Sequence, residues 1–146
     1  GVFNRFLGAV VIEVGARAMG PKGSTAMAAL GSGRDMIALM IDALTDGAAH
    51  RAAIGRPYGF ETSVMMSFIA ARPDRRPDHA ALSDAIQALE SCHKFEFAFG
   101  PERDAPATTD LSTVLGRATL AHTDEARLTQ DHAALRAVEN AHAGPF

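Results

Sequence analysis

Apolar residues recur every three or four positions through much of the chain, the spacing of one face of an α-helix. The first such stretch, residues 3–19, is interpreted as a helix, and a strand over "AVVIEV" at 9–14 is the competing interpretation. The pattern predicts further helices at 24–30, 34–45, 60–72, 78–93, 110–120 and 125–142. Alternating phenylalanines near 94–99 favour one short extended segment.

Breaks rich in glycine, proline and charge separate these stretches. They read "GPKGST", "GSG", "GRPYG", "RPDRRPD", "PERDAPATT" and "AHTDE", and such residues end helices and form turns. We therefore expect a mainly α fold, a single compact domain over 1–146 that resembles a helical bundle of six to seven short helices. Residues 1–55 would form the N-terminal helices, and residues 60–142 would form two helical hairpins.

Composition narrows the class of protein. With 146 residues, 47% of them apolar, the chain is long enough to fold as one domain. A net charge of -3 and scattered lysines and arginines argue against a nucleic-acid partner. The lone cysteine, Cys92, excludes an internal disulfide framework and fits a reducing compartment, so we expect a cytoplasmic protein. No apolar run approaches the roughly 20 residues of a membrane span.

Two short segments each place a glutamate three residues before a histidine. They are "ALESCH" at 88–93 and "AVENAH" at 137–142. On a helix, residues three apart project from nearly the same face. Such a pair could therefore offer a carboxylate oxygen and an imidazole nitrogen to one metal ion or to two neighbouring ones.

Each pair also has a lone carboxylate 29 residues before its glutamate: Glu61 before Glu90, and Asp110 before Glu139. The midpoints fall in "RPDRRPD" and "AHTDE", where helical hairpins would turn. Over residues 61–142 this spacing resembles the ferritin-like dimetal-carboxylate family. The resemblance implies a protein that handles iron, oxygen or peroxide. Its two iron or manganese ions would be held by Glu61, Glu90, His93, Asp110, Glu139 and His142.

The same residues also fit ordinary helix chemistry, which requires no cofactor. The two glutamates would then be solvated, and His93 and His142 would lie near helix C-termini, where a charged imidazole is favourable. Asp110 would cap the helix that follows it. On this interpretation the glutamate–histidine spacing has no metal-binding role.

The helix predicted at 34–45 is apolar on most of its circumference, which a chain of this length has difficulty covering alone. We therefore expect a helical interaction or structural module that forms a homo-oligomer or binds a protein partner, using helix 1–19 or helix 34–45. The sequence establishes no catalytic role. It has no nucleophile elbow, zinc helix or dinucleotide fingerprint, and "GPKGST" lacks the spacing of a phosphate loop.

Overall fold

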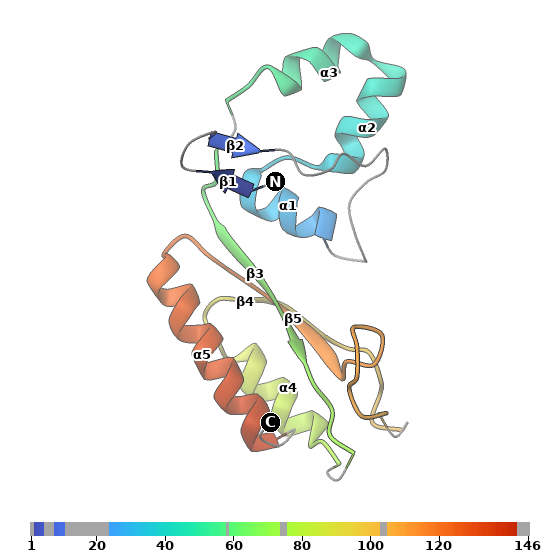
Figure 1. The fold of residues 1–146 in the computed structure, drawn as a ribbon, viewed down its shortest axis with the longest axis vertical. Helices are drawn as coiled ribbons and strands as arrows, with labels where there is room; N and C mark the ends of the chain where they lie inside the picture. The colour runs from blue at the N-terminus through green and yellow to red at the C-terminus, as the bar shows by residue number, and fades with distance from the viewer. Residues whose placement is uncertain are drawn as a thin grey trace. The chain divides into compact units, whose positions relative to one another are not determined.

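The computed structural model describes residues 2–4, 8–10, 24–57, 59–73, 76–102 and 105–142. The chain divides into two compact units, the first made of residues 1–29 and 34–57 and the second of residues 30–33 and 58–146. Figure 1 shows their elements coloured in chain order.

The first unit contains a small hairpin and short helices. Strands β1 (Val2–Asn4) and β2 (Gly8–Val10) pair antiparallel. Helix α1 (Ser24–Ser32) follows and ends in the second unit, and α2 (Met36–Thr45) and α3 (Gly47–Ile54) complete the first. Aspartates fix where the last two begin: Asp35 accepts hydrogen bonds from the first turn of α2, and Asp46 does so for α3.

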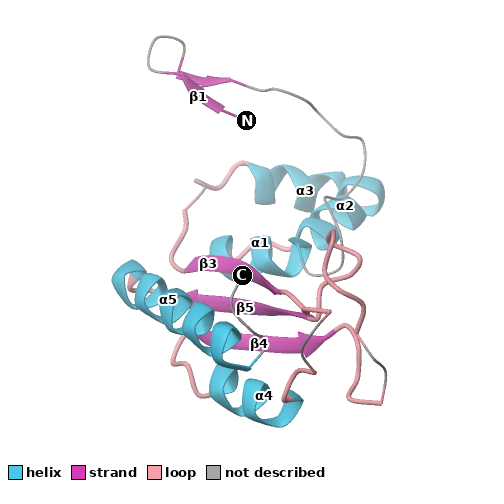
Figure 2. Ribbon diagram, turned by 60° about the horizontal axis from the view of Figure 1, so that its bottom comes forward, coloured by secondary structure: helices cyan, strands magenta, loops and turns pink. Residues whose placement is uncertain are grey.

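The second unit is a three-stranded antiparallel sheet with two helices. Its elements are β3 (Ser63–Ile69), α4 (His79–Gln87), β4 (Cys92–Phe97), β5 (Gly116–His122) and α5 (Glu125–His142). The strand order is β3-β5-β4, so β5 is central and β3 and β4 are the edges. Both helices pack against the sheet and contact each other (Figure 2).

The core of the second unit lies between the sheet and these helices. Alternation along β5 directs Ala118 and Leu120 into it, where they meet Leu82 and Ile86 of α4. The other fully or nearly buried apolar members are Ile69, Ala71, Leu115, Leu128 and Leu135. This layer places the buried face of α5 directly on the edge strand β3.

The prediction of a mainly α, bundle-like fold is wrong, because the second unit combines α-helices with an antiparallel sheet. The segments predicted as helices at 60–72 and 110–120 contain strands β3 and β5. At the N-terminus, residues 2–4 and 8–10 are strands where a helix from 3 to 19 was expected, and residues 11–19 lie outside the described residues.

Two of the predicted helices are confirmed, and two other segments agree in part. The helix at 125–142 is α5, and the apolar helix at 34–45 corresponds to α2. The helix expected to reach residue 93 ends at Gln87, and the extended segment near 94–99 overlaps β4. Over the ranges given above, no helix is long and apolar enough to cross a membrane.

Candidate interaction surfaces

The six residues predicted to bind metal are dispersed over the second unit. Glu61 precedes β3, Glu90 lies in the turn after α4, His93 is an exposed residue of β4, and Asp110 lies in a turn before β5. Only Glu139 and His142 share a helix. No group of three or more potential ligands that could hold a metal ion occurs among the described residues.

The expectation of a metal-binding helical bundle is therefore corrected. A dimetal site of this kind requires Glu90 and His93 on one helical turn, but α4 ends before Glu90, and His93 belongs to a strand. It also required helices at Glu61 and Asp110, and neither residue is helical. Without those helices, a separation of 29 residues does not align the carboxylates.

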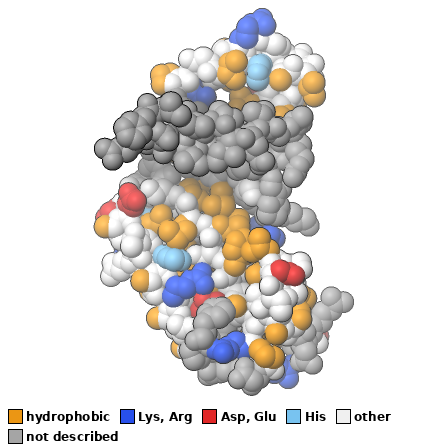
Figure 3. All heavy atoms as spheres, viewed as in Figure 1, with side chains coloured by type: hydrophobic (Ala, Val, Ile, Leu, Met, Phe, Trp, Pro, Cys, Tyr) orange, Lys and Arg blue, Asp and Glu red, His pale blue; other side chains and the backbone are white. Residues whose placement is uncertain are grey.

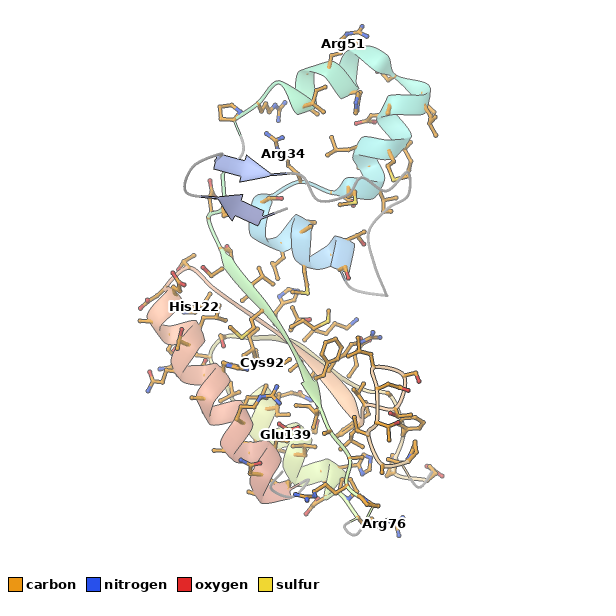
Figure 4. All side chains as sticks on the ribbon, viewed as in Figure 1. Arg34, Arg51, Arg76, Cys92, His122 and Glu139 are labelled. Carbon is orange, nitrogen blue, oxygen red and sulfur yellow. The ribbon has the colours of Figure 1, made fainter. Side chains whose placement is uncertain are left out.

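Glu139 is buried, with 1% of its surface exposed, and it binds the end of strand β3. Its Oε1 accepts a hydrogen bond of 2.7 Å from the N–H of Ala70, and its Oε2 pairs with Arg136 one turn earlier on α5. Arg136 Nη1 also donates to the carbonyl of Phe68 at 3.1 Å. Figure 4 shows Glu139 on α5. Glu139 and Arg136 thus bind one N–H and one carbonyl at the end of β3.

Asp131 has an equivalent role at the start of β4. It is 2% exposed, and its Oδ2 accepts a hydrogen bond of 2.7 Å from the N–H of Ser91, while Oδ1 lies 3.1 Å from Arg127 Nε. Burial raises the pKa of Asp131, but the hydrogen bonds from Ser91 and the ion pair with Arg127 outweigh burial and leave the pKa below its ordinary value. Asp131 therefore remains charged inside the unit.

Glu90 belongs to the exposed side of this network. Its carboxylate lies 3.2 Å from Arg127 Nε and 3.6 Å from His122 Nε2, and its side chain is 60% exposed. Pairs this exposed contribute little to stability. The two glutamate–histidine motifs therefore have different structural roles, since Glu139 is a buried anchor and Glu90 a surface partner.

Asp110 and the lone cysteine, Cys92, have local structural roles. Asp110 accepts hydrogen bonds from the N–H and hydroxyl of Ser112, which lower the pKa of its carboxyl. This closes a turn rather than capping a helix. Cys92 contacts the core and burial raises the pKa of its thiol, which disfavours the reactive thiolate.

Helix α2 presents an exposed apolar face in the first unit. Four large side chains contribute to it: Ile37 is 44% exposed, Met40 41%, Ile41 54% and Leu44 86%. No residue of α2 is buried. Figure 3 shows hydrophobic side chains, in orange, on the surface of the part that carries α2 and α3. The excess of apolar residues at 34–45 predicted this helix from the sequence.

A pocket of about 380 Å³ lies between the beginning of β3 and the first turns of α5. Phe60, Thr62, Ser63, Val64 and Met65 line one side, and Glu125, Leu128 and Thr129 line the other. Periodicity could not have revealed it, because 60–72 was interpreted as a helix. The pocket forms only where β3 and α5 come together, so no local pattern in the sequence indicates it.

Comparison with known proteins provides no relative: no family model, curated protein or solved structure matches this chain. The features of this chain that point to a function are the exposed helix, the edge strand and the pocket.

Proposed function

We propose that the chain is a protein-interaction module that associates with a second copy of itself through the exposed face of α2. The observation that carries the proposal is the exposure of four large aliphatic side chains on one short helix. Fully burying a side chain of this kind is worth roughly 1.5–3 kcal/mol. Leu44 can gain most of this value, whereas Ile37, Met40 and Ile41 are already about half covered and can gain about half of it.

The four side chains lie on one face of α2. At about 100° per residue, Ile37, Met40, Ile41 and Leu44 fall within a sector of about 100°. The only charged residue within α2, Asp42, points about 140° away from Ile37. The apolar face can therefore be covered without burying a charge, which favours a protein surface as its partner.

The more covered side of α2 faces its own unit. Met36 and Leu39 are partly buried, and the Leu39 carbonyl lies 3.2 Å from His50 Nδ1 of α3. Packing inside the unit therefore accounts for the opposite side of α2, and the residues that the structure describes leave the face at 37, 40, 41 and 44 exposed. A usual surface helix has the reverse arrangement, with its polar side outward.

The spacing on this face suits a two-fold partner. Ile37 and Leu44 are equally distant in sequence from the midpoint between Met40 and Ile41. If two α2 helices pack antiparallel, Ile37 of each copy meets Leu44 of the other, and Met40 meets Ile41. Antiparallel packing also places the N-terminus of each helix dipole near the C-terminus of the other.

Light scattering coupled to size-exclusion chromatography tests the association. We expect twice the mass of the chain at micromolar concentration, and the single-chain mass for Ile41→Glu, because that substitution places a charge in the apolar interface. Ala38→Glu is the matched control, since Ala38 is exposed about 100° from Ile37 and lies in the first turn, where a negative charge is favourable. A single-chain mass for the unaltered protein, or equal dissociation by both variants, would contradict the proposal.

A further inference from the structure

Three hydrogen bonds show which backbone groups of β3 point toward β5 and which point to its outer edge. Ile69 accepts a hydrogen bond from the N–H of Leu115 on the side of β5. The carbonyl of Phe68 and the N–H of Ala70 are instead bound by Arg136 and Glu139. Since alternate residues of a strand direct their backbone groups to opposite sides, Val64 and Met66 direct theirs to the outer edge as well.

The two ends of this edge are covered. At one end, Arg136 supplies a donor to Phe68 and Glu139 an acceptor to Ala70, as the backbone of a neighbouring strand would. At the other end, the last turn of α1 closely approaches the strand, because a Cβ on Gly31 would lie 3.3 Å from the carbonyl oxygen of Thr62 and 3.4 Å from Cγ2 of Val64. Between these ends, the outward backbone groups of Val64 and Met66 bond to no residue that the structure describes.

The pocket adjoins this open stretch. It is lined by Ser63 and Met65, whose side chains lie on the helix side of β3, and by Glu125 and Leu128 of α5. Its volume of about 380 Å³ lies within the range of sites that hold a small ligand or a single large side chain. The wall is apolar along Met65 and Leu128, and Glu125 adds one negative charge.

From this geometry we propose that the outer edge of β3 binds an extended peptide as an additional antiparallel strand, with the pattern apolar, basic, apolar. The peptide backbone pairs with Val64 and Met66. The central lysine or arginine enters the pocket, with its aliphatic part along Met65 and Leu128 and its charge near Glu125. The flanking residues lie on the opposite face, one beside the side chain of Met66 and the other beside Val64, where the end of α1 also lies.

This site lies in the second unit and does not depend on association through α2. The test is an NMR titration of the full chain, labelled with ¹⁵N, with the peptide Ser-Val-Lys-Val-Ser. We expect saturable shifts of the Val64 and Met66 amide signals at millimolar peptide or below. Methylation of both valine amides should abolish the shifts, since in antiparallel pairing those groups contact β3. Methylation of the lysine amide, which points away, should leave the shifts unchanged.

Protein variants test strand pairing and charge attraction separately. Met66→Pro removes one outward N–H at an edge position where proline is tolerated, and we expect binding to weaken about tenfold relative to Met66→Thr. Glu125→Lys should weaken binding of the lysine peptide and restore binding to Ser-Val-Glu-Val-Ser, whereas Glu102→Lys, at an exposed turn, should change neither.

Three outcomes would overturn the proposal. The first is the absence of saturable shifts at Val64 and Met66. The second is equal binding of the peptides methylated on valine and on lysine. The third is sensitivity to Glu125→Lys with no loss from backbone methylation, which would indicate charge attraction without strand pairing. The peptide variants keep the test decisive if Met66→Pro does not fold.

Discussion

A buried carboxylate on α5 stabilises the end of an edge strand. Replacing Glu139 with Ala leaves the Ala70 N–H without its acceptor, so we expect a loss of about 1–3 kcal/mol in the free energy of unfolding. Arg136 is 36% exposed and can regain water, which limits the cost. Urea denaturation measures this free energy.

Glu90→Ala is the matched control, because Glu90 was assigned the same metal-binding role from the sequence but forms only exposed ion pairs. We expect a loss of less than about 1 kcal/mol for this variant. A loss at Glu90 equal to that at Glu139 would show that burial does not distinguish the two glutamates.

Asp131 should make the free energy of unfolding depend on pH in the acidic range. The pKa of Asp131 in the folded protein lies below its ordinary value, which is about 3.9 for an unfolded chain. The charged carboxylate therefore stabilises the fold above that value, and the contribution is lost as the pH falls through the folded pKa. We expect Asp131→Asn to destabilise the protein at pH 7, and the difference from the unaltered protein to narrow toward pH 3.

Comparing the two proteins at each pH removes the effect of the other carboxylates, which titrate in both. Chemical denaturation across this range is the measurement. A difference that stays constant from neutral to acidic pH would mean that the charge of Asp131 contributes nothing to stability.

At the scale of elements, the central strand depends on one close backbone approach. A Cβ on Gly116 of β5 would lie 2.7 Å from the carbonyl oxygen of Glu96 on β4. Because a backbone atom would have to shift, we expect Gly116→Ala to lower the free energy of unfolding by about 1–3 kcal/mol.

Gly100→Ala provides the comparison for that substitution. A Cβ at Gly100 would have no neighbour within 4 Å, and the loop does not require a left-handed conformation there. The variant should be neutral or gain up to about 1 kcal/mol, because alanine restricts the unfolded chain. Thermal or urea unfolding of both variants checks the contrast, and equal effects would contradict the close packing of β4 and β5.

The sequence predicted helices more reliably than strands. The apolar spacing of α5 located that helix. The predicted helix at 78–93 contains α4, which begins after Asp78, and Asp78 accepts a hydrogen bond from the N–H of Ala81. In "SVMMSFI" of β3, Met65, Phe68 and Ile69 fit a helical face as well as they fit a strand. Only pairing with β5, which lies about 50 residues away in sequence, selects the strand.

The turn at Asp110 illustrates the same limit. The carboxylate does accept a hydrogen bond from a backbone N–H two residues later, as an N-cap would. No helix follows, because the N–H of Leu115 bonds to Ile69 in the neighbouring strand. The sequence predicts that Asp110 accepts a hydrogen bond from the backbone that follows it. It does not predict that Leu115 bonds to Ile69 in a neighbouring strand.

At the scale of the whole molecule, the two proposed surfaces lie in different units. The face of α2 was foreseen as an excess of apolar residues, whereas the edge of β3 and its pocket exist only once the sheet is known. The two proposals can therefore fail separately. Ile41→Glu should leave the peptide shifts at Val64 and Met66 intact, and Glu125→Lys should leave the mass of the associated protein unchanged.

Disulfide trapping between two copies of the chain tests association through α2 by its geometry. In a Cys92→Ser background, one preparation carries Ile37→Cys and another carries Leu44→Cys, and the two are mixed under mild oxidation. We expect rapid formation of the mixed dimer, because antiparallel helices bring these two positions together, and little disulfide bonding in either preparation alone. Equal bonding in all three samples, or bonding only between identical chains, would contradict the proposed interface.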